Sequence, residues 1–462
     1  MKPKTTLILL LLLIAVGGFY WFWGIKGQET RERQQELANR ILPMEQENIN
    51  RVALVQAGDT TVVYEQSDDE WTITHPVQTS ADQTRIETNL NAFLEAEQKR
   101  IIATELTDLQ PYGLDRPQAE VAITYNDTGK VTLLIGNQNP TGSSVYAKRD
   151  DGPSIYTTNT NIVSQGKKQL FDLRDRSIAK FDRNAITKIV ISRENGETLE
   201  FNKMDGDWRL AEPQVKAQNS QVSSLLSGLA TRQVQEYFEE TPVNLDDYGL
   251  DNPRILVSLF TNDTTRTAAV QIGNAVDDSN SPDYYARDLS RPMIFSVGNN
   301  VVTNIRKSPF EFQDKGLFAI NSGQVTDMKV SWNDTTYQVS KIDTAWKMMQ
   351  PVEAQADADK AQRMARSLSN VQVDSLGSYT QTDPARYGFD APWMEVRFHI
   401  SGSEFDGFTV GDPANDTRRY ITTDSSPYVY EIRPSKLNEF QLSLDDIVAE
   451  SEQDTTTVAT GE

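Results

Sequence analysis

The sequence predicts an α+β protein of three tandem, antiparallel-rich repeats, which follow one N-terminal transmembrane helix. Three observations support this prediction: a set of residues that occurs three times, strand and turn patterns that recur around it, and an uncharged N-terminal run. Each repeat has about 137 residues, which is close to the commonest domain size and far longer than the roughly 20–50 residues of a solenoid unit. We therefore expect three duplicated domains, each of which buries its own core.

The recurring set consists of one Trp, one Pro, a Tyr-Gly-Leu/Phe-Asp-x-Pro turn and a later Gly. The members follow one another in the same order in each copy, and their spacing is constant to within one position. We interpret the set as a structural motif, made of Trp71, Pro76, Tyr112, Gly113, Asp115 and Gly136, then Trp208, Pro213, Tyr248, Gly249, Asp251 and Gly273, then Trp346, Pro351, Tyr387, Gly388, Asp390 and Gly411.

Seven short apolar segments per copy, separated by turn residues, predict seven strands, with one or two helices. In the first copy the segments cover residues 51–55, 61–64, 71–75, 121–125, 130–135, 145–147 and 154–156. Residues that tolerate positive φ recur at one fixed distance before the Trp and predict hairpin turns there; they are Gly58, Asn195 and Asn333. Short polar residues recur at one fixed distance after the Trp and are expected to cap a helix; they are Asp82, Asn219 and Asp357.

Residues 5–25 form a continuous run without a charge. As a helix this run spans about 31 Å, enough to cross the hydrocarbon core of a bilayer. Lys2 and Lys4 precede it and predict a cytoplasmic N-terminus, with the rest of the chain outside. Small residues at 15–17 leave a cleaved signal peptide as the alternative, but the aromatic run at residues 19–23 favours a retained anchor.

The expected protein is therefore a single-pass protein of the inner (cytoplasmic) membrane, with its bulk in the periplasm or outside the cell. The expected parts are an anchor at 1–26, a polar helical stalk at 27–47, repeat domains at 48–182, 183–322 and 323–448, and a disordered acidic tail at 449–462.

Composition excludes several classes of site. The net charge is −21, which repels phosphate backbones, so nucleic-acid binding is not expected. We interpret the acidity mainly as a contribution to solubility, with cation or partner binding as the alternative. The absence of cysteine excludes disulfides, thiolate zinc sites, iron–sulfur clusters and cysteine nucleophiles. His75 and His399, the two histidines, occupy unrelated repeat positions, so a Ser-His-Asp triad or a histidine zinc site is not expected.

Two groups of acidic residues resemble functional sites. Asp115, Asp251 and Asp390 could act as carboxylates in a cleft. A catalytic residue, however, is usually unique, whereas this aspartate occurs once in each of the three copies, at the same motif position. We expect each to bond nearby backbone amides in its turn. Residues 277–283 resemble a calcium loop but lack the sixth-position Gly and twelfth-position Glu, so we interpret them as a solvated insertion. No catalytic residue, cofactor site or metal site is predicted.

The anchor, the spaced Trp71 and Pro76, the Tyr112-Gly-Leu-Asp-x-Pro turn and the strand ending at Gly136 together resemble the bacterial family called domain of unknown function 4340. The resemblance covers most of the chain after about residue 48, and the third copy is degraded, with Phe389 in place of Leu. Members of that family are generally envelope proteins, often encoded beside ABC-type transport systems that resemble gliding-motility components. The resemblance implies an accessory role and brings no catalytic residues.

The resulting prediction is a non-enzymatic, membrane-anchored extracytoplasmic protein that binds or scaffolds a protein partner, such as subunits of an ABC-type transport or envelope complex. A small-molecule ligand is not specified. One alternative is a carboxylate-dependent envelope hydrolase, which requires paired acids in one cleft. The other is a glycan-binding surface protein, which requires exposed aromatic side chains at positions such as Tyr146, Tyr285 and Tyr420.

Overall fold

The computed structural model describes residues 26–103, 108–262, 265–381, 383–400 and 405–449, with side chains from residue 31 onward. The chain divides into two compact units, residues 1–177 and residues 178–462. The expected membrane anchor at 1–26 and the expected acidic tail at 449–462 lie almost wholly outside the described residues. Within the described ranges, no helix combines the length and the apolar composition needed to cross a membrane.

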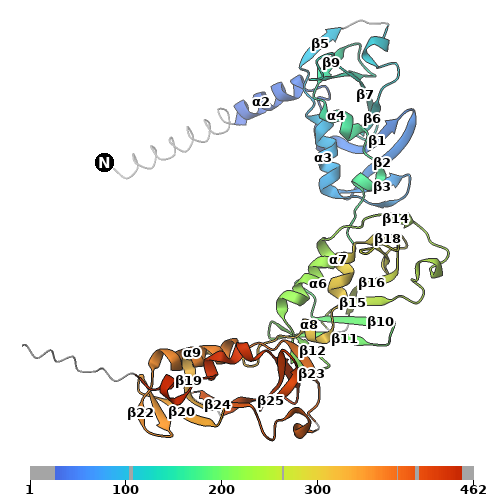
Figure 1. Cartoon of the computed structure of the whole chain (residues 1–462). Helices are drawn as coiled ribbons and strands as arrows, with labels where there is room; N and C mark the ends of the chain where they lie inside the picture. Colours follow the sequence, from blue (N-terminus) through green and yellow to red (C-terminus); the bar gives the residue numbers. More distant parts are fainter. Residues whose placement is uncertain (1–25, 104–107, 263–264, 382, 401–404, 450–462) are drawn as a thin grey trace, which may run out of the picture. The chain divides into compact units, whose positions relative to one another are not determined.

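Unit 1 contains a polar helix, α2 (Lys26–Asn39), followed by one nine-stranded antiparallel sheet (Figure 1). The sheet order is β4-β3-β2-β1-β6-β7-β8-β9-β5, so two meanders join where β1 pairs with β6. The strands are β1 (Ile49–Gln56), β2 (Asp59–Ser67), β3 (Glu70–His75), β4 (Thr79–Ser80), β5 (Arg100–Ala103), β6 (Ala119–Tyr125), β7 (Gly129–Gln138), β8 (Val145–Arg149) and β9 (Ile155–Thr158). The helices are η2 (Gln46–Asn48), α3 (Gln83–Leu94), η3 (Gln110–Tyr112), α4 (Asn161–Gly166) and α5 (Leu170–Leu173).

Unit 2 contains two sheets with the same strand order as unit 1. The first has β10 (Lys188–Arg193), β11 (Thr198–Met204), β12 (Asp207–Leu210), β13 (Val215–Lys216), α6 (Asn219–Thr231), β14 (Tyr237–Glu239), η4 (Asp246–Tyr248), β15 (Ile255–Thr261), β16 (Thr265–Ala275), β17 (Tyr284–Asp288), β18 (Ile294–Val297), α7 (Asn299–Ile305) and α8 (Pro309–Phe312). The second has η5 (Ser322–Gln324), β19 (Val325–Trp332), β20 (Thr335–Ile342), β21 (Ala345–Gln350), β22 (Ala354–Gln355), α9 (Ala358–Asn370), β23 (Ser375–Ser378), η6 (Pro384–Tyr387), β24 (Met394–Ile400), β25 (Asp406–Asn415), β26 (Arg418–Thr423), β27 (Val429–Ile432), η7 (Pro434–Phe440) and α10 (Leu444–Ile447).

The three antiparallel α+β repeats are confirmed, but each has nine strands rather than the expected seven. The two strands that the sequence pattern missed in the first repeat are β4 and β5. β4 has only two residues, too few to show a period of two. β5 follows the helix and crosses to the far edge of the sheet to pair with β9, a long-range pairing that local sequence does not reveal.

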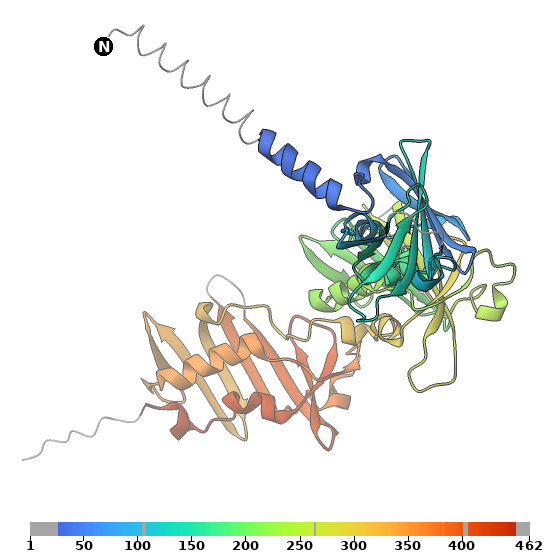
Figure 2. The same cartoon turned by 90° about the horizontal axis from the view of Figure 1, so that it is seen from above.

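Each repeat buries its own core, as expected. The buried residues of the three core clusters come from three separate stretches of the chain, 41–173, 178–312 and 318–447. In the first repeat Ile86, Leu90 and Phe93 on one side of α3 are fully buried against the sheet. Figure 2 shows the corresponding helix α9 lying across one face of the third sheet. The second and third cores begin a few positions before residues 183 and 323, which the sequence predicts as the first residues of those domains.

The cap expectations are confirmed in part. The Asp82 carboxylate accepts a hydrogen bond from Arg85 N, and Asp357 caps α9 in the same way. Asn219 is not a cap: it is the first residue of α6, and the capping position is Gln218, whose side chain makes no capping hydrogen bond. The copies differ here because the polar residue lies one place further into the helix in the second repeat.

The hairpin turns show a similar partial agreement. Gly58 and Asn333 have φ of 86° and 51°, as expected. Asn195 does not adopt positive φ; Gly196 does, at 84°, while the Asn195 side chain accepts a hydrogen bond from Glu197 N. Because Asn and Gly are adjacent, sequence alone could not place the left-handed residue between them.

The chain enters the first and third repeats through the same backbone joint. Ile41 N donates to Ala96 O at 2.9 Å, and Leu317 N donates to Val371 O at 3.0 Å. In each case a short entering segment pairs with the segment that follows the long helix, and its apolar residues pack into or against the repeat core. In unit 2 the connecting segment also pairs with the second repeat, through an isolated bridge between Ala217 and Gln313, and it forms part of the site described next.

Candidate ligand-binding cleft

The repeat tryptophans belong to the three cores. Trp71, Trp208 and Trp346 are 2%, 5% and 3% exposed. Side-chain amides fix the neighbouring backbone: Gln83 Oε1 accepts from Trp71 N at 2.8 Å, and Asn219 Oδ1 accepts from Trp208 N at 3.0 Å. The peptide bonds before the motif prolines Pro76, Pro213 and Pro351 are cis. The tryptophans are therefore not available to bind a ligand.

The two glycines of the motif have different structural roles. Gly113, Gly249 and Gly388 end short 3₁₀ turns with φ of 65°, 64° and 73°, a conformation that favours glycine. The later glycine is required by close packing instead. A Cβ on Gly136 would lie 2.2 Å from the carbonyl oxygen of Tyr112, and the other copies give 2.1 Å and 1.9 Å. The fixed Tyr-to-Gly spacing thus reflects backbone contact between the turn and the strand.

The motif tyrosines pack edge-to-face on the tyrosines that we singled out as possible glycan contacts. Tyr112 and Tyr146 have ring centroids 5.0 Å apart at an interplanar angle of 81°. Tyr248 with Tyr285 and Tyr387 with Tyr420 repeat the arrangement at 4.9 Å and 5.0 Å. Because each ring is half-buried or buried against its partner, none presents a free aromatic platform.

The motif aspartates are exposed and lie on three different sheets. Asp251 accepts a hydrogen bond from Asn252 N at 2.8 Å. The expected turn bonds are missing at Asp115 and Asp390, whose carboxylates have no hydrogen bond within the described part of the chain. The turn is held instead by backbone bonds such as Gly113 N to Gln110 O. No two of these acids share a sheet.

The histidines and the acidic loop belong to three different repeats. His75 lies beside the Thr60 carbonyl at 3.1 Å, and His399 contacts the Thr326 hydroxyl at 2.9 Å. In the loop at 277–283, hydrogen bonds from Ser279 lower the pKa of Asp277. The described residues include no group of three or more His, Asp or Glu side chains arranged to hold a metal ion.

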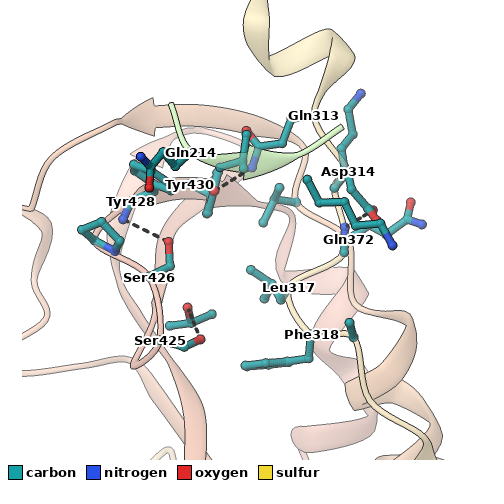
Figure 3. A pocket seen from close by; sticks show the side chains of 18 of the residues that line it. Gln214, Gln313, Asp314, Leu317, Phe318, Gln372, Ser425, Ser426, Tyr428 and Tyr430 are labelled. Carbon is teal, nitrogen blue, oxygen red and sulfur yellow. Dashed lines mark hydrogen bonds between the residues drawn. The ribbon is translucent and has the colours of Figure 1, made fainter. Parts of the chain in front are cut away.

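Unit 2 contains a cleft of about 730 Å³ where the second and third sheets meet (Figure 3). Its walls come from β12 and β13 of the second sheet, from the connecting segment 313–319, and from the end of α9 and the β26–β27 loop of the third repeat. We call this site the junction cleft. Its volume lies within the range of pockets that bind small molecules and peptide side chains.

The junction cleft carries an excess of positive charge in an acidic protein. Arg209, Lys216 and Lys315 line it together with one carboxylate, Asp314. Lys216 pairs with Asp207 at 3.0 Å, and Lys315 lies over the Phe310 ring. Arg209 is exposed, and its guanidinium makes no hydrogen bond or ion pair with any residue in the described ranges.

Another part of the cleft lining carries aromatic and hydroxyl side chains. Gln313 Nε2 donates to the Tyr430 hydroxyl at 2.7 Å, and burial raises the pKa of that tyrosine. Gln313 is only 5% exposed, and its Oε1 has no hydrogen-bond partner among the described residues. Tyr428 packs on Tyr379, whose pKa is raised to about 12, mainly by burial. An unsatisfied buried acceptor at the wall of a cleft is costly unless water or a ligand satisfies it.

The segment that forms the cleft floor is held by local hydrogen bonds. Asp314 Oδ1 accepts from Gly316 N at 3.1 Å, so the chain turns directly from α8 into the third repeat. Unit 1 ends with the same type of turn, in which Asp175 Oδ1 accepts a hydrogen bond from Ser177 N at 2.9 Å. The turn places Lys315 and Leu317 in the cleft wall and leaves Gly316 exposed.

Two further hollows adjoin the junction cleft. One of about 550 Å³ shares Arg209 and Gln214 with it and adds Met204, which is 53% exposed. The other, of about 600 Å³, shares Ser425 and Ser426 with it. The three hollows share lining residues at the junction of the two repeats, and we call them together the trough.

Sequence reasoning did not identify the junction cleft. The β26–β27 loop belongs to the third repeat, the copy in which the motif is degraded. Arg209, however, follows the motif Trp, where the other copies have Thr72 and Lys347. No local pattern predicts that Arg209 and Ser425 line one cleft, because they belong to different repeats.

The fold and the cleft define a class: tandem α+β repeat proteins whose recurring motif builds the domains and whose candidate binding surface lies between them. The chain belongs to the family described as domain of unknown function (DUF4340), whose model matches residues 71–214, 208–347 and 346–457. Each match begins at a repeat tryptophan. Neither the curated proteins nor the solved structures include a match to the chain.

Proposed function

We propose that the protein is a non-enzymatic, membrane-anchored extracytoplasmic protein that binds or scaffolds a protein partner in the cell envelope, as an accessory to an ABC-type transport or envelope complex. The observation that carries the proposal is the placement of the motif. Its aromatic residues and glycines serve the fold, and its aspartates lie exposed on separate sheets.

Two further features support this function. The uncharged run at residues 5–25 provides the anchor, and the polar helix α2 connects it to the first repeat. Tandem repeats present several surfaces on one chain, which raises avidity without requiring a deep catalytic pocket. The junction cleft is then the leading candidate for partner recognition.

The test is crosslinking and affinity capture from native membranes with the full-length chain. The control is the same chain truncated after Ser177, which retains the complete core of unit 1. Full-length protein is expected to retain specific envelope proteins, with subunits of transport systems encoded nearby as first candidates, and the truncated chain to lose most of them. Equal capture by both chains would show that unit 2 contributes nothing to partner binding.

The hydrolase alternative makes a different prediction. If the motif aspartates acted chemically, replacing Asp115, Asp251 and Asp390 by Asn would abolish a hydrolytic activity of the purified chain. We expect the triple variant to capture the same partners as the unmodified chain, because the three side chains are exposed and serve neither the core nor the cleft.

A further inference from the structure

We propose that the junction cleft binds an extended, acidic peptide segment of a partner protein, with Arg209 receiving a carboxylate of that segment. The inference deepens the proposed function and rests on it, since it names the chemistry of the partner. It starts from the charge of the junction cleft itself, whose lining has three cations and one carboxylate in a chain of net charge −21. Asp207 pairs with one of these cations, Lys216, and the two adjoining hollows each add one carboxylate, Asp205 and Asp424, so the excess of positive charge is confined to the junction cleft. At physiological salt the Debye length is about 8 Å, so distant acids are screened while cleft cations act at contact.

Arg209 is suited to receive the carboxylate. Its side chain is exposed, borders both the junction cleft and the hollow around Met204, and has no hydrogen bond or ion pair in the described ranges. Lys216 pairs with Asp207, and Lys315 lies over an aromatic ring. Hydrogen bonds from Asn219 and Lys216 lower the pKa of Asp207, and the nearby charge of Arg209 adds a smaller effect without forming an ion pair. A planar guanidinium can bind a carboxylate in a bidentate manner, which a lysine cannot.

The rest of the trough suits an extended main chain with alternating side chains. Exposed Gln214 and Gln372 offer amide donors and acceptors that match peptide groups. Leu317 and Tyr428 add apolar surface to the lining, and Met204 adds a flexible apolar surface to the hollow that Arg209 also lines. An extended peptide presents successive side chains to opposite faces, so acidic and apolar positions can alternate along such a trough.

A glycan is the less suitable ligand. The lining contains hydroxyl and amide side chains, but Val215, Leu317, Phe318, Val373 and Pro427 interrupt them with apolar surface that offers the hydroxyl groups of a sugar no side-chain hydrogen bonds. The tyrosines that could stack on a sugar ring are committed to edge-to-face contacts or are buried, as Tyr430 is. Oligosaccharide binding is therefore kept as an outcome of the test that would contradict the proposal.

The test uses purified full-length chain and fluorescent peptides of roughly eight residues, about 26 Å when extended, in which Glu and Leu alternate. Control peptides carry Lys in place of Glu. Binding is measured by fluorescence anisotropy at low and at physiological salt. The acidic peptide is expected to bind, to bind more weakly as salt increases, and to exceed the basic peptide in affinity.

Three variants locate the binding. Arg209→Gln is expected to lower the affinity for the acidic peptide by about tenfold, because it removes a charge-assisted hydrogen bond. Lys347→Gln is the matched control, because Lys347 also follows its motif Trp, is exposed and lies outside the cleft. Ser425→Trp fills the border between two hollows and is expected to abolish binding, with an unchanged thermal melt showing that the fold persists.

The proposal is overturned if the acidic peptide binds no better than the basic one, if both charge variants lose affinity equally, or if a neutral oligosaccharide binds the cleft and displaces the peptide. These results are distinguishable from failure of the proposed function. Peptide binding is measured on the purified chain, whereas the proposed function depends on capture from membranes. If Arg209→Gln leaves capture from membranes unchanged, the proposed scaffolding function stands and the cleft is not the site where the partner binds.

Discussion

The close packing of the last motif glycine predicts a large cost for a small substitution. In Gly136→Ala the new Cβ would lie 2.2 Å from the Tyr112 carbonyl oxygen, whereas real Cβ contacts essentially never fall below 3.0 Å. The strand and the turn must therefore move apart. The obstructing atom belongs to the backbone of η3, so no side-chain rotation relieves the contact.

The magnitude follows from two opposing effects. Overpacking of this kind costs about 1–3 kcal/mol, while Gly to Ala stabilises by about 0.4–1 kcal/mol through the unfolded chain. Because the contact is far inside the normal limit, we expect a net loss of about 2 kcal/mol. For a unit of this size the loss corresponds to a decrease in Tm of about 4–8 °C.

The assay is urea denaturation of residues 27–177, followed by intrinsic fluorescence. This segment holds a single tryptophan, Trp71, which is 2% exposed and so reports directly on unfolding of the core. Gly152→Ala is the matched control, since a Cβ there meets nothing within 4 Å and its φ is not in the left-handed region. If both variants unfold at the same urea concentration, the packing explanation for the motif glycine is wrong.

Three other outcomes follow from the structure. Tyr64→Phe should cost about 1–2 kcal/mol in urea denaturation, because it removes the 2.9 Å hydrogen bond to Asn89 Oδ1 and leaves that buried acceptor unpaired; an unchanged midpoint would contradict this. The hydrogen bond to Glu239 raises the pKa of Tyr248 to about 12. The stabilisation from this hydrogen bond is therefore complete below the unfolded pKa of about 10 and is lost between about pH 10 and 12. The tyrosinate absorbance of the unmodified chain, after subtraction of the absorbance of Tyr248→Phe, should show that late titration. Asp115→Asn should change stability by less than about 0.5 kcal/mol, since the side chain is exposed; a larger loss would restore a structural role for the carboxylate.

The repeat architecture was predictable because it depends on residues that return at fixed spacing. Seven of the nine strands per repeat were found because each has enough residues to show alternation or an apolar run. β4 was missed for lack of length and β5 for lack of a local partner, since it pairs across the sheet with β9. The prediction that Asn219 caps a helix was wrong because Asn219 lies one position further into its helix than expected. Its side chain therefore accepts a hydrogen bond from Trp208 N and does not cap the helix.

The sequence by itself determined that this protein is three copies of one domain, and that the Trp-Pro-Tyr-Gly-Asp-Gly set belongs to the fold, since a set that returns in register must satisfy the same local packing three times. Only the tertiary structure decided why Gly136 recurs, because the Tyr112 oxygen that excludes a side chain belongs to the turn before β6, whereas Gly136 lies in β7. Only it located the junction cleft, because Arg209 and Ser425 line that cleft from two different repeats, an arrangement that follows from packing of whole domains and leaves no periodic trace in the chain.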